Sequence, residues 1–228
     1  MALLNPNLSI LPPAQVELWS ELSQTPKNFV LYGGTGLALR LGHRESIDFD
    51  FFSHQEFDPN RLFNKIPYLQ DQEVLSTDKN TLDALVTNSQ GVVKCSYFGV
   101  PRLNQAFTPD VAIDNGIALA SLHDIFATKC ATVAHRVEVK DYLDIHALIT
   151  VAKLPLAEGL AAAKTVYGNQ FNPNVALKAI QHFEGDIGQQ LSVGQKSDLI
   201  KAVKELGYDL SQLAGIGEGQ PIGFGLSL

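Results

Sequence analysis

Two aspartates that alternate along one short segment are the residues with the clearest chemical potential in this sequence. Asp48 and Asp50 lie in Ser-Ile-Asp-Phe-Asp-Phe-Phe, residues 46–52, where residues alternate as in a strand with one buried face. Both carboxylates of such a strand project from the same face, and they repel each other unless a cation lies between them. Because Mg²⁺ prefers oxygen ligands, the pattern indicates a magnesium site; solvated side chains on an edge strand are the alternative.

A glycine turn precedes this strand. Gly33-Gly34-Thr35 lies between an apolar run at residues 28–32, which predicts a buried strand, and a helical pattern at residues 35–42. The backbone N–H groups of such a turn bind anions such as phosphate, although glycine pairs also occur where the backbone simply needs a positive φ. No Gly-Lys-Ser/Thr follows, and Leu39 stands where a dinucleotide-binding fingerprint has its third glycine, so neither of those nucleotide folds is expected.

A third group of charged residues follows Ser121, where apolar residues begin to recur at helical spacing. Lys129 and Arg136 are seven positions apart, and on one helix they share a face whose exposed cations can bind phosphate. Asp141 and Asp144 follow in the next helical segment. A solvated helix face with a few salt bridges is the alternative interpretation.

These two regions resemble one known family. The run from Leu31 to Phe52, which holds the glycine turn and the aspartate pair, resembles the first motif of the AbiEii/AbiGii toxin-type nucleotidyltransferases, members of the DNA polymerase β-like superfamily. Lys129, Arg136 and the Lys-Asp-Tyr-Leu-Asp run at residues 140–144 are similar to a later motif of that family. The resemblance covers residues 28–150 and implies an α/β (α+β) fold: a nucleotidyltransferase-like mixed sheet with flanking helices, followed by a C-terminal helical region.

The function that the resemblance implies is Mg²⁺-dependent transfer of a nucleotidyl group from an NTP to an RNA (tRNA) or protein acceptor. The protein would be the toxin of a toxin–antitoxin or phage-defence pair, with a cognate antitoxin. Because Lys129 is expected to be exposed, Lys129→Ala is predicted to weaken NTP binding while thermal stability scarcely changes. The implied catalytic residues are Asp48, Asp50, Lys129 and Asp144, with Mg²⁺ on the aspartate pair, and the implied nucleotide-binding residues are Gly33, Gly34, Thr35, Arg44, Ser46, Lys129, Arg136 and Asp141.

The sequence departs from this superfamily in one respect. Many of its enzymes carry a third carboxylate on a neighbouring strand as general base, but the strand expected at residues 91–98 has none. Asp83 and Asp114 are candidate substitutes, and Asp144 or a metal-bound water could also accept the proton. Two other functions therefore stay open: a non-catalytic descendant that binds an NTP or a protein partner, and a metal-dependent phosphohydrolase that uses the same aspartate pair.

The elements that must position these residues follow from hydrophobic periodicity. Residues 1–118 are predicted to form the nucleotidyltransferase-like core, which includes a short N-terminal helix after Pro12-Pro13, and residues 119–228 are predicted to be helical. A loose glycine-rich tail is expected at residues 215–225. Besides the strands named above, strands are expected at residues 70–77 and 81–87, a short helix after Asp58-Pro59, and later helices at residues 138–153, 155–167, 173–183 and 195–206.

The amino-acid composition limits the kinds of partner that the protein is expected to bind. The 228 residues carry a formal net charge of −7, so general DNA binding is not expected and any RNA contact needs a local basic patch or a bound cation. The two cysteines, Cys95 and Cys130, are too few for a disulfide scaffold and are expected to be inert core residues. Without a recognisable signal peptide or membrane-spanning segment, the protein is expected to be cytoplasmic.

Overall fold

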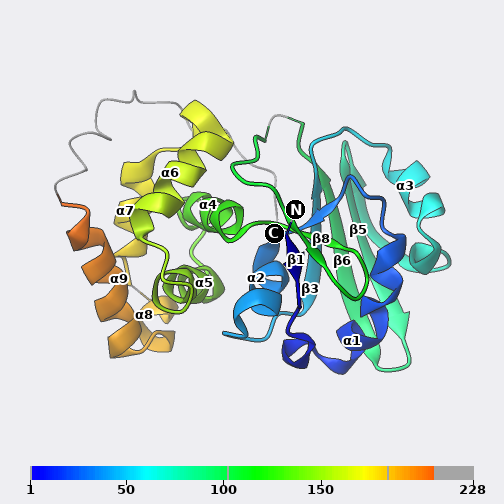
Figure 1. Ribbon diagram of the computed structural model, residues 1–228, viewed down its shortest axis with the longest axis horizontal. Helices are drawn as coiled ribbons and strands as arrows, with labels where there is room; N and C mark the ends of the chain where they lie inside the picture. Colours follow the sequence, from blue (N-terminus) through cyan, green and yellow to red (C-terminus); the bar gives the residue numbers. More distant parts are fainter. Residues whose placement is uncertain (1, 102, 184, 208–228) are drawn as a thin grey trace. The chain divides into compact units, whose positions relative to one another are not determined.

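The computed structural model describes residues 2–101, 103–183 and 185–207, and the glycine-rich tail expected at residues 215–225 lies outside them. The chain divides into two compact units, Met1–Ile125 and Phe126–Leu228 (Figure 1). Each unit is described by itself below. The division into a core of residues 1–118 and a helical region from residue 119 stays a prediction.

The first unit contains one mixed sheet, which has eight strands within the described residues, in the order β1-β7-β8-β2-β3-β6-β5-β4. Its centre is formed by β3, which pairs antiparallel with β2 and parallel with β6. The strands are β1 (Leu3–Leu4), β2 (Val30–Leu31), β3 (Asp48–Ser53), β4 (Glu73–Asp78), β5 (Thr81–Asn88), β6 (Gly91–Gly99), β7 (Asp110–Ala112) and β8 (Ala118–Leu119).

Among the residues that the structure describes, three α-helices accompany the sheet: α1 (Pro13–Trp19), α2 (Gly33–Leu41) and α3 (Pro59–Lys65). Proline at the start of α1 and α3 favours helix initiation, and the Asp58 side chain caps α3 by accepting a hydrogen bond from the Arg61 N–H. Gly42, with φ 61°, ends α2 in the left-handed conformation. Short 3₁₀ helices lie at Leu8–Ile10, Glu21–Gln24 and Pro67–Leu69.

The core of this unit is aromatic and lies under β3 and β6. Phe49 and Phe51 are fully buried, and Phe51 stacks on Tyr97 with ring centroids 5.2 Å apart. The rings of Trp19 in α1 and Phe49 also pack together, with centroids 6.2 Å apart. Burial of each such side chain contributes about 1.5–3 kcal/mol, so this packing holds the odd-numbered residues of β3 inward and leaves its even-numbered residues on the opposite face.

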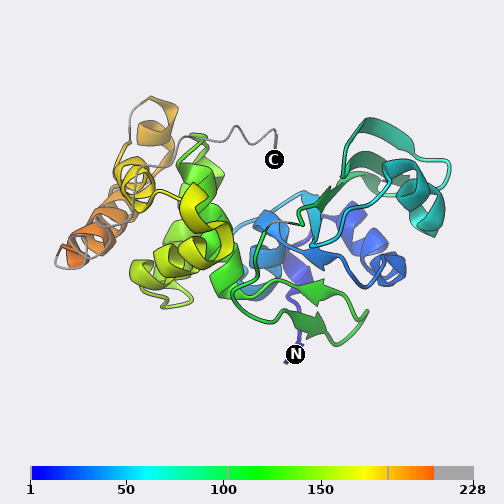
Figure 2. The same ribbon diagram turned by 90° about the horizontal axis from the view of Figure 1, so that it is seen from above.

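The second unit is built of helices in its described part (Figure 2), and α4 crosses from the first unit into it. Gly159 of α6 packs directly on the Phe126 ring, where a Cβ atom would lie 2.6 Å from the ring. The last helix begins with a capping box between Ser192 and Gln195. The helices are α4 (Leu122–Val133), α5 (Val139–Thr150), α6 (Leu156–Tyr167), α7 (Pro173–Ile180), α8 (Asp186–Gln190) and α9 (Val193–Glu205), with a 3₁₀ turn at Gly168–Gln170.

The predicted fold class, a mixed sheet with flanking helices followed by a helical region, is confirmed. Three strands of two or three residues, β1, β7 and β8, and the five-residue α8 were not predicted, because segments this short show no periodic pattern. None of the helices that the structure describes combines the length and the apolar character that crossing a bilayer requires.

Candidate active site on the sheet of the first unit

The aspartate pair lies on one face of β3. Asp48 and Asp50 are half-buried. Phe49 and Phe51, which alternate with them along the strand, point into the core. The predicted alternation is therefore confirmed. Because β3 is an interior strand of the sheet, the edge-strand alternative for the two aspartates is excluded.

The glycine turn is joined to this strand by two hydrogen bonds. The Tyr32 N–H donates to the Asp50 carbonyl at 2.9 Å, and the Thr35 hydroxyl donates to the Asp48 carbonyl at 2.5 Å. Thr35 is buried, so its hydroxyl fixes the start of α2 on β3. The Thr35 hydroxyl is thus already used as a donor, and the group of Thr35 that can bind an anion at the start of α2 is its backbone N–H.

Polar side chains lie so close to Gly33 and Gly34 that neither position has room for a Cβ atom. A Cβ at Gly33, where φ is +68°, would collide with the Asp50 carboxylate. A Cβ at Gly34 would lie 2.5 Å from Nη2 of Arg44 and 2.9 Å from Oγ of Ser46. A carboxylate, a guanidinium and a hydroxyl thus meet at the first turn of α2, whose N–H groups lack intrahelical partners.

The first-motif residues predicted for the site are therefore close together in the first unit. Arg40 steadies α2 from the other side, donating to the Asp110 carboxylate of β7 at 2.9 Å and to the Leu119 carbonyl of β8 at 3.2 Å. Anchored at both ends, α2 presents its N-terminus next to the aspartate pair. This arrangement can bind a phosphate chain together with a divalent cation.

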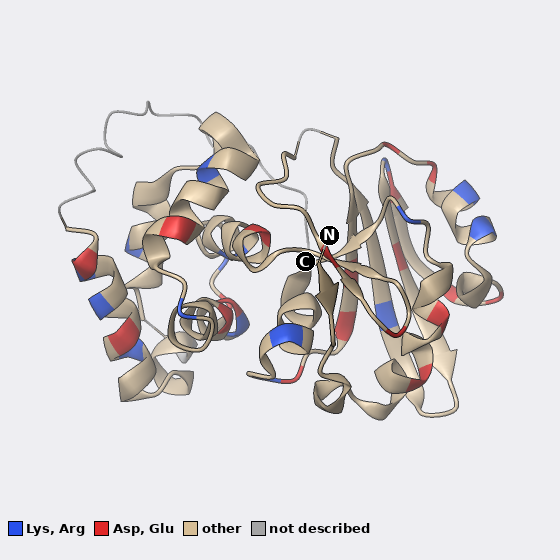
Figure 3. Ribbon diagram, in the orientation of Figure 1, with Lys and Arg blue, Asp and Glu red and all other residues tan. Residues whose placement is uncertain are grey.

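Strand β6 supplies the neighbours of the aspartates, and Figure 3 shows charged residues on both strands. In this parallel pairing Lys94 lies opposite Asp48, and Ser96 lies opposite Asp50. Ser96 is buried, and its hydroxyl has no hydrogen-bond partner in the part of the chain that the structure describes. The residue of β6 that lies beside Asp50 is thus a serine and not a carboxylate.

The two candidate substitutes for that carboxylate lie elsewhere. Asp83 is on β5, opposite Ser96 and one strand further from Asp50, and it accepts a hydrogen bond from Ser76 at 2.8 Å. Asp114 lies between β7 and β8, where the Trp19 indole N–H donates to it at 2.7 Å. Strands β8 and β2 separate that turn from β3, so Asp83 is the nearer of the two in the sheet.

The two cysteines are buried. Cys95 lies in the core on the opposite face of β6, and burial, followed by the negative charges of Asp50 and Asp48, raises the pKa of its thiol. Burial also raises the pKa of the Cys130 thiol in the helical unit. Both thiols stay protonated at neutral pH, as expected for inert core residues.

The later motif forms a buried ion-pair cluster within the second unit. Lys129 of α4 lies 2.9 Å from Asp141 and 2.7 Å from Asp144, both on α5. Arg136 donates from Nε to Asp141 at 2.9 Å. The Lys129 side chain is only 7% exposed and both aspartates are fully buried. The expectation of an exposed Lys129 is therefore wrong, because two carboxylates one turn apart on α5 draw its ammonium group into the interior.

The charges of this cluster stabilise one another. Burial alone would raise the pKa of Asp141, but Lys129 and Arg136 hold that pKa below its ordinary value. Burial alone would lower the pKa of Lys129, but Asp144 and Asp141 hold it above its ordinary value. Lys129 and Asp141 are thus ionised at neutral pH. The roles of Lys129, Arg136, Asp141 and Asp144 in nucleotide binding or catalysis stay predictions.

Comparisons with known proteins agree with the geometry of the first unit. The sequence profile of the family described as "Nucleotidyl transferase AbiEii toxin, Type IV TA system" matches residues 17–88, which include the glycine turn and the aspartate pair. A protein of Aquifex aeolicus (strain VF5), aq_aa25, is 33% identical over 159 residues, which are 69% of this chain and 74% of that protein. The chain belongs to the AbiEii nucleotidyltransferase toxin family.

The fold of this AbiEii-family protein is shared with a solved toxin structure. MenT4, a nucleotidyltransferase toxin of Mycobacterium tuberculosis H37Rv, superposes with a TM-score of 0.55 at 18% sequence identity, covering 88% of this chain and 85% of MenT4. At this identity the likeness establishes the fold. Membership of a toxin family suggests that the protein acts on a nucleotide and has an antitoxin as its partner.

Proposed function

We propose that this nucleotidyltransferase moves a nucleotidyl group from an NTP to an acceptor hydroxyl, with Mg²⁺ held by Asp48 and Asp50. The observation that carries the proposal is the position of these carboxylates: they share one face of β3, and Asp50 lies against Gly33 at the anion-binding start of α2. Carboxylates that can hold a cation and helix-start N–H groups that can bind a phosphate thus lie side by side in one unit.

The donor set fits magnesium. No group of three or more His, Cys, Asp or Glu residues that could hold a metal is found in the described part of the chain. Two aspartates are nevertheless the usual protein contribution for Mg²⁺, which takes its remaining ligands from substrate phosphates and water. When bound, Mg²⁺ supplies charge neutralisation on the triphosphate and polarises the reacting oxygens.

The residues of the chain then position the reactants. The N–H groups of Gly33, Gly34 and Thr35, with the Arg44 guanidinium and the Ser46 hydroxyl, bind the phosphate chain, so that the α-phosphorus lies over the aspartate pair. The acceptor oxygen forms a bond to that phosphorus, the bond to the bridging oxygen breaks, and pyrophosphate leaves. With Ser96 beside Asp50, the acceptor proton passes to water.

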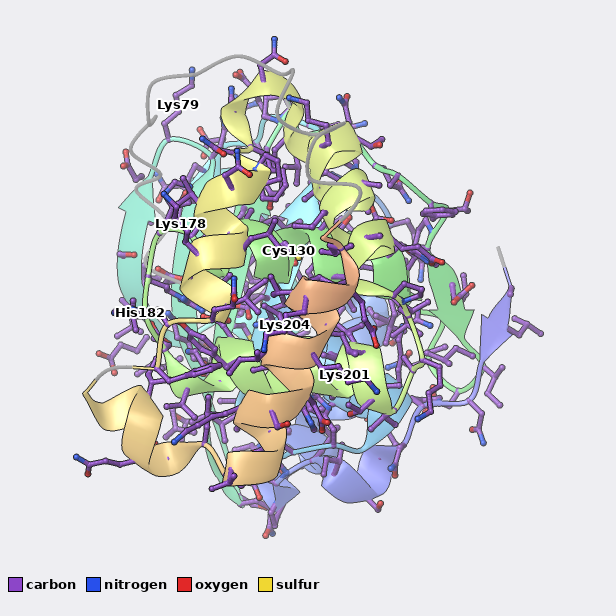
Figure 4. All side chains as sticks on the ribbon, turned by 90° about the vertical axis from the view of Figure 1, so that its left-hand side faces the viewer. Lys79, Cys130, Lys178, His182, Lys201 and Lys204 are labelled. Carbon is purple, nitrogen blue, oxygen red and sulfur yellow. The ribbon has the colours of Figure 1, made fainter. Side chains whose placement is uncertain are left out.

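We further propose that the acceptor is RNA. A molecule with net charge −7 needs a local cationic surface to bind a polyanion. Figure 4 shows Lys178 on α7, and Lys201 and Lys204 on α9, with their side chains directed outward. These three exposed lysines belong to two helices that pack on each other, so together they can contact neighbouring phosphates. A protein acceptor would be revealed by the same test.

Transfer of label tests the proposal. The protein is incubated with each α-³²P-labelled NTP, Mg²⁺ and either total RNA or total protein. We expect labelled RNA from the wild type, and Asp48→Asn and Asp50→Asn should each lower the rate by at least about a hundredfold, the scale of losing one preorganised electrostatic contact to the transition state. Asp78→Asn, an exposed aspartate at the end of β4, serves as the matched control and should leave the rate unchanged. Full activity in both site variants would refute the metal site, and label on protein alone would refute the RNA acceptor.

A further inference from the structure

Two lysines of this chain differ in how far their charge is already neutralised. Lys129 is 7% exposed and lies 2.9 and 2.7 Å from two carboxylates. The Lys94 side chain is 31% exposed, and its ammonium group lies 3.8 Å from one carboxylate oxygen of Asp83. Because hydrogen bonds between such groups are about 2.7–2.9 Å long, Lys94 retains hydrogen-bonding capacity for a ligand.

Lys94 also stands at the right place in the sheet. It is in register with Asp48 across the β3–β6 pair, and residues paired in this way project from the same face. On β6 it lies two residues before Ser96 and on the same face, and Ser96 lies beside Asp50. Lys94 therefore rises from the same face of the sheet as the two aspartates, on the strand next to them.

Asp83 holds Lys94 without fully neutralising it. One oxygen of the Asp83 carboxylate accepts the Ser76 hydroxyl at 2.8 Å, which fixes the carboxylate on the β4 side of β5. The other oxygen is buried without a hydrogen-bond partner in the described structure and has only the long ion pair with Lys94. A lysine tethered at that distance can turn toward a stronger anion at little cost.

We propose that Lys94 is a nucleotide-binding residue whose ammonium group binds the triphosphate of the NTP at the aspartate pair, and that Asp83 positions it when the nucleotide is absent. This inference rests on the proposed function, since it concerns the same site. The triphosphate brings more negative charge than one divalent cation offsets, and Ser96 in place of a third carboxylate leaves fewer anionic ligands for additional metal. Lys94 supplies the missing positive charge from the protein itself.

Nucleotide binding in the absence of an acceptor tests this role without relying on activity. Affinity for a non-hydrolysable α,β-methylene NTP and for the corresponding NMP is measured by titration with Mg²⁺ present. Lys94→Met should weaken triphosphate binding by about ten- to a hundredfold, the scale of one charge-assisted contact, and NMP binding by less than about threefold. Lys94→Arg should retain most of the affinity. Lys79→Met, which removes an exposed lysine of the same unit (labelled in Figure 4), is the matched control and should not differ from wild type.

A double variant tests the positioning role of Asp83. Asp83→Asn should weaken triphosphate binding by a smaller factor than Lys94→Met, and adding it to Lys94→Met should cause no additional loss, because the two residues act through one contact. Equal triphosphate affinity in wild type and Lys94→Met, with binding still lost in Asp50→Asn, would overturn the role of Lys94 and leave the proposed function standing. A wild type that binds no NTP would overturn both.

Discussion

Lys129 lies in a different environment from the one that its helical spacing indicates, because its side chain is buried and not exposed. The expectation that Lys129 and Arg136 share one helix is wrong, because α4 ends at Val133 and Arg136 lies in the segment before α5. The two residues are near one another because both pair with Asp141 of α5. Asp141 and Asp144, three residues apart on α5, both face Lys129 and remove it from solvent. The cost of a change at Lys129 is therefore set by the two buried carboxylates that would be left behind.

We accordingly predict that Lys129→Met destabilises the protein. Removing the lysine leaves Asp141 and Asp144 buried without their shared cation, which costs about 3–5 kcal/mol. Urea unfolding followed by circular dichroism should show the lower midpoint. Lys201→Met on α9, whose side chain is 73% exposed, should shift the midpoint very little. An unchanged midpoint for Lys129→Met would mean that the cluster does not stabilise the helical unit.

The same cluster predicts a pH dependence. Because the pKa of Asp141 is held below its ordinary value in the folded state, its ionisation stabilises the fold above the ordinary aspartate pKa of about 4. As the pH falls through the lowered pKa of the folded state, this contribution is lost. The wild type should therefore exceed Asp141→Asn in thermal midpoint at pH 7, and the gap should narrow below about pH 4. A gap that is constant between pH 7 and pH 3 would contradict this account.

Among the elements, α2 and β3 were predicted well and the sheet order was not. The alternation at residues 46–52 is a local pattern, so the strand and the shared face of Asp48 and Asp50 follow from sequence. The neighbour of β3 does not, because β6 joins it from far along the chain. That pairing decides that Ser96 lies beside Asp50 and Lys94 beside Asp48, and no local pattern reveals it.

The start of α2 yields a prediction of its own. Gly34→Ala adds a methyl group that would lie 2.5 Å from the Arg44 guanidinium and must displace it from the first turn. Since alanine is the better helix former by about 1 kcal/mol, stability should hold or rise, whereas NTP affinity should fall by about tenfold with the lost charge-assisted contact.

Gly194→Ala is the matched control for this change. Gly194 is also a second helical residue, in α9, and a Cβ there would meet nothing closer than the Ser192 hydroxyl at 3.8 Å. It should stabilise α9 without altering NTP affinity. If both alanine variants bind NTP like the wild type, Arg44 has no part in the phosphate site.

For the whole molecule, net charge separates non-specific from specific nucleic-acid binding. With a charge of −7, retention on duplex DNA should be negligible at physiological salt. RNA binding through Lys178, Lys201 and Lys204 should weaken when all three are changed to alanine, and the slope of log affinity against log salt should become shallower by about 2. A triple variant of Lys27, Lys65 and Lys79 in the first unit is the control. Equal losses in both triple variants would show that net charge, and not this surface, governs RNA binding.

The parallel pairing of β3 with β6 also has a consequence for the time at which the toxin becomes competent during its synthesis. Asp48 and Asp50 leave the ribosome well before Lys94 and Ser96, whereas β5 and β6 form a local hairpin that can close as soon as it is made. Because translation proceeds at about 5–20 residues per second, several seconds pass between the synthesis of the two aspartates and that of β6. A nascent chain interrupted before β6 therefore carries the two aspartates proposed to bind Mg²⁺ but lacks the neighbouring strand of their sheet face. This face is complete only after most of the first unit has been translated.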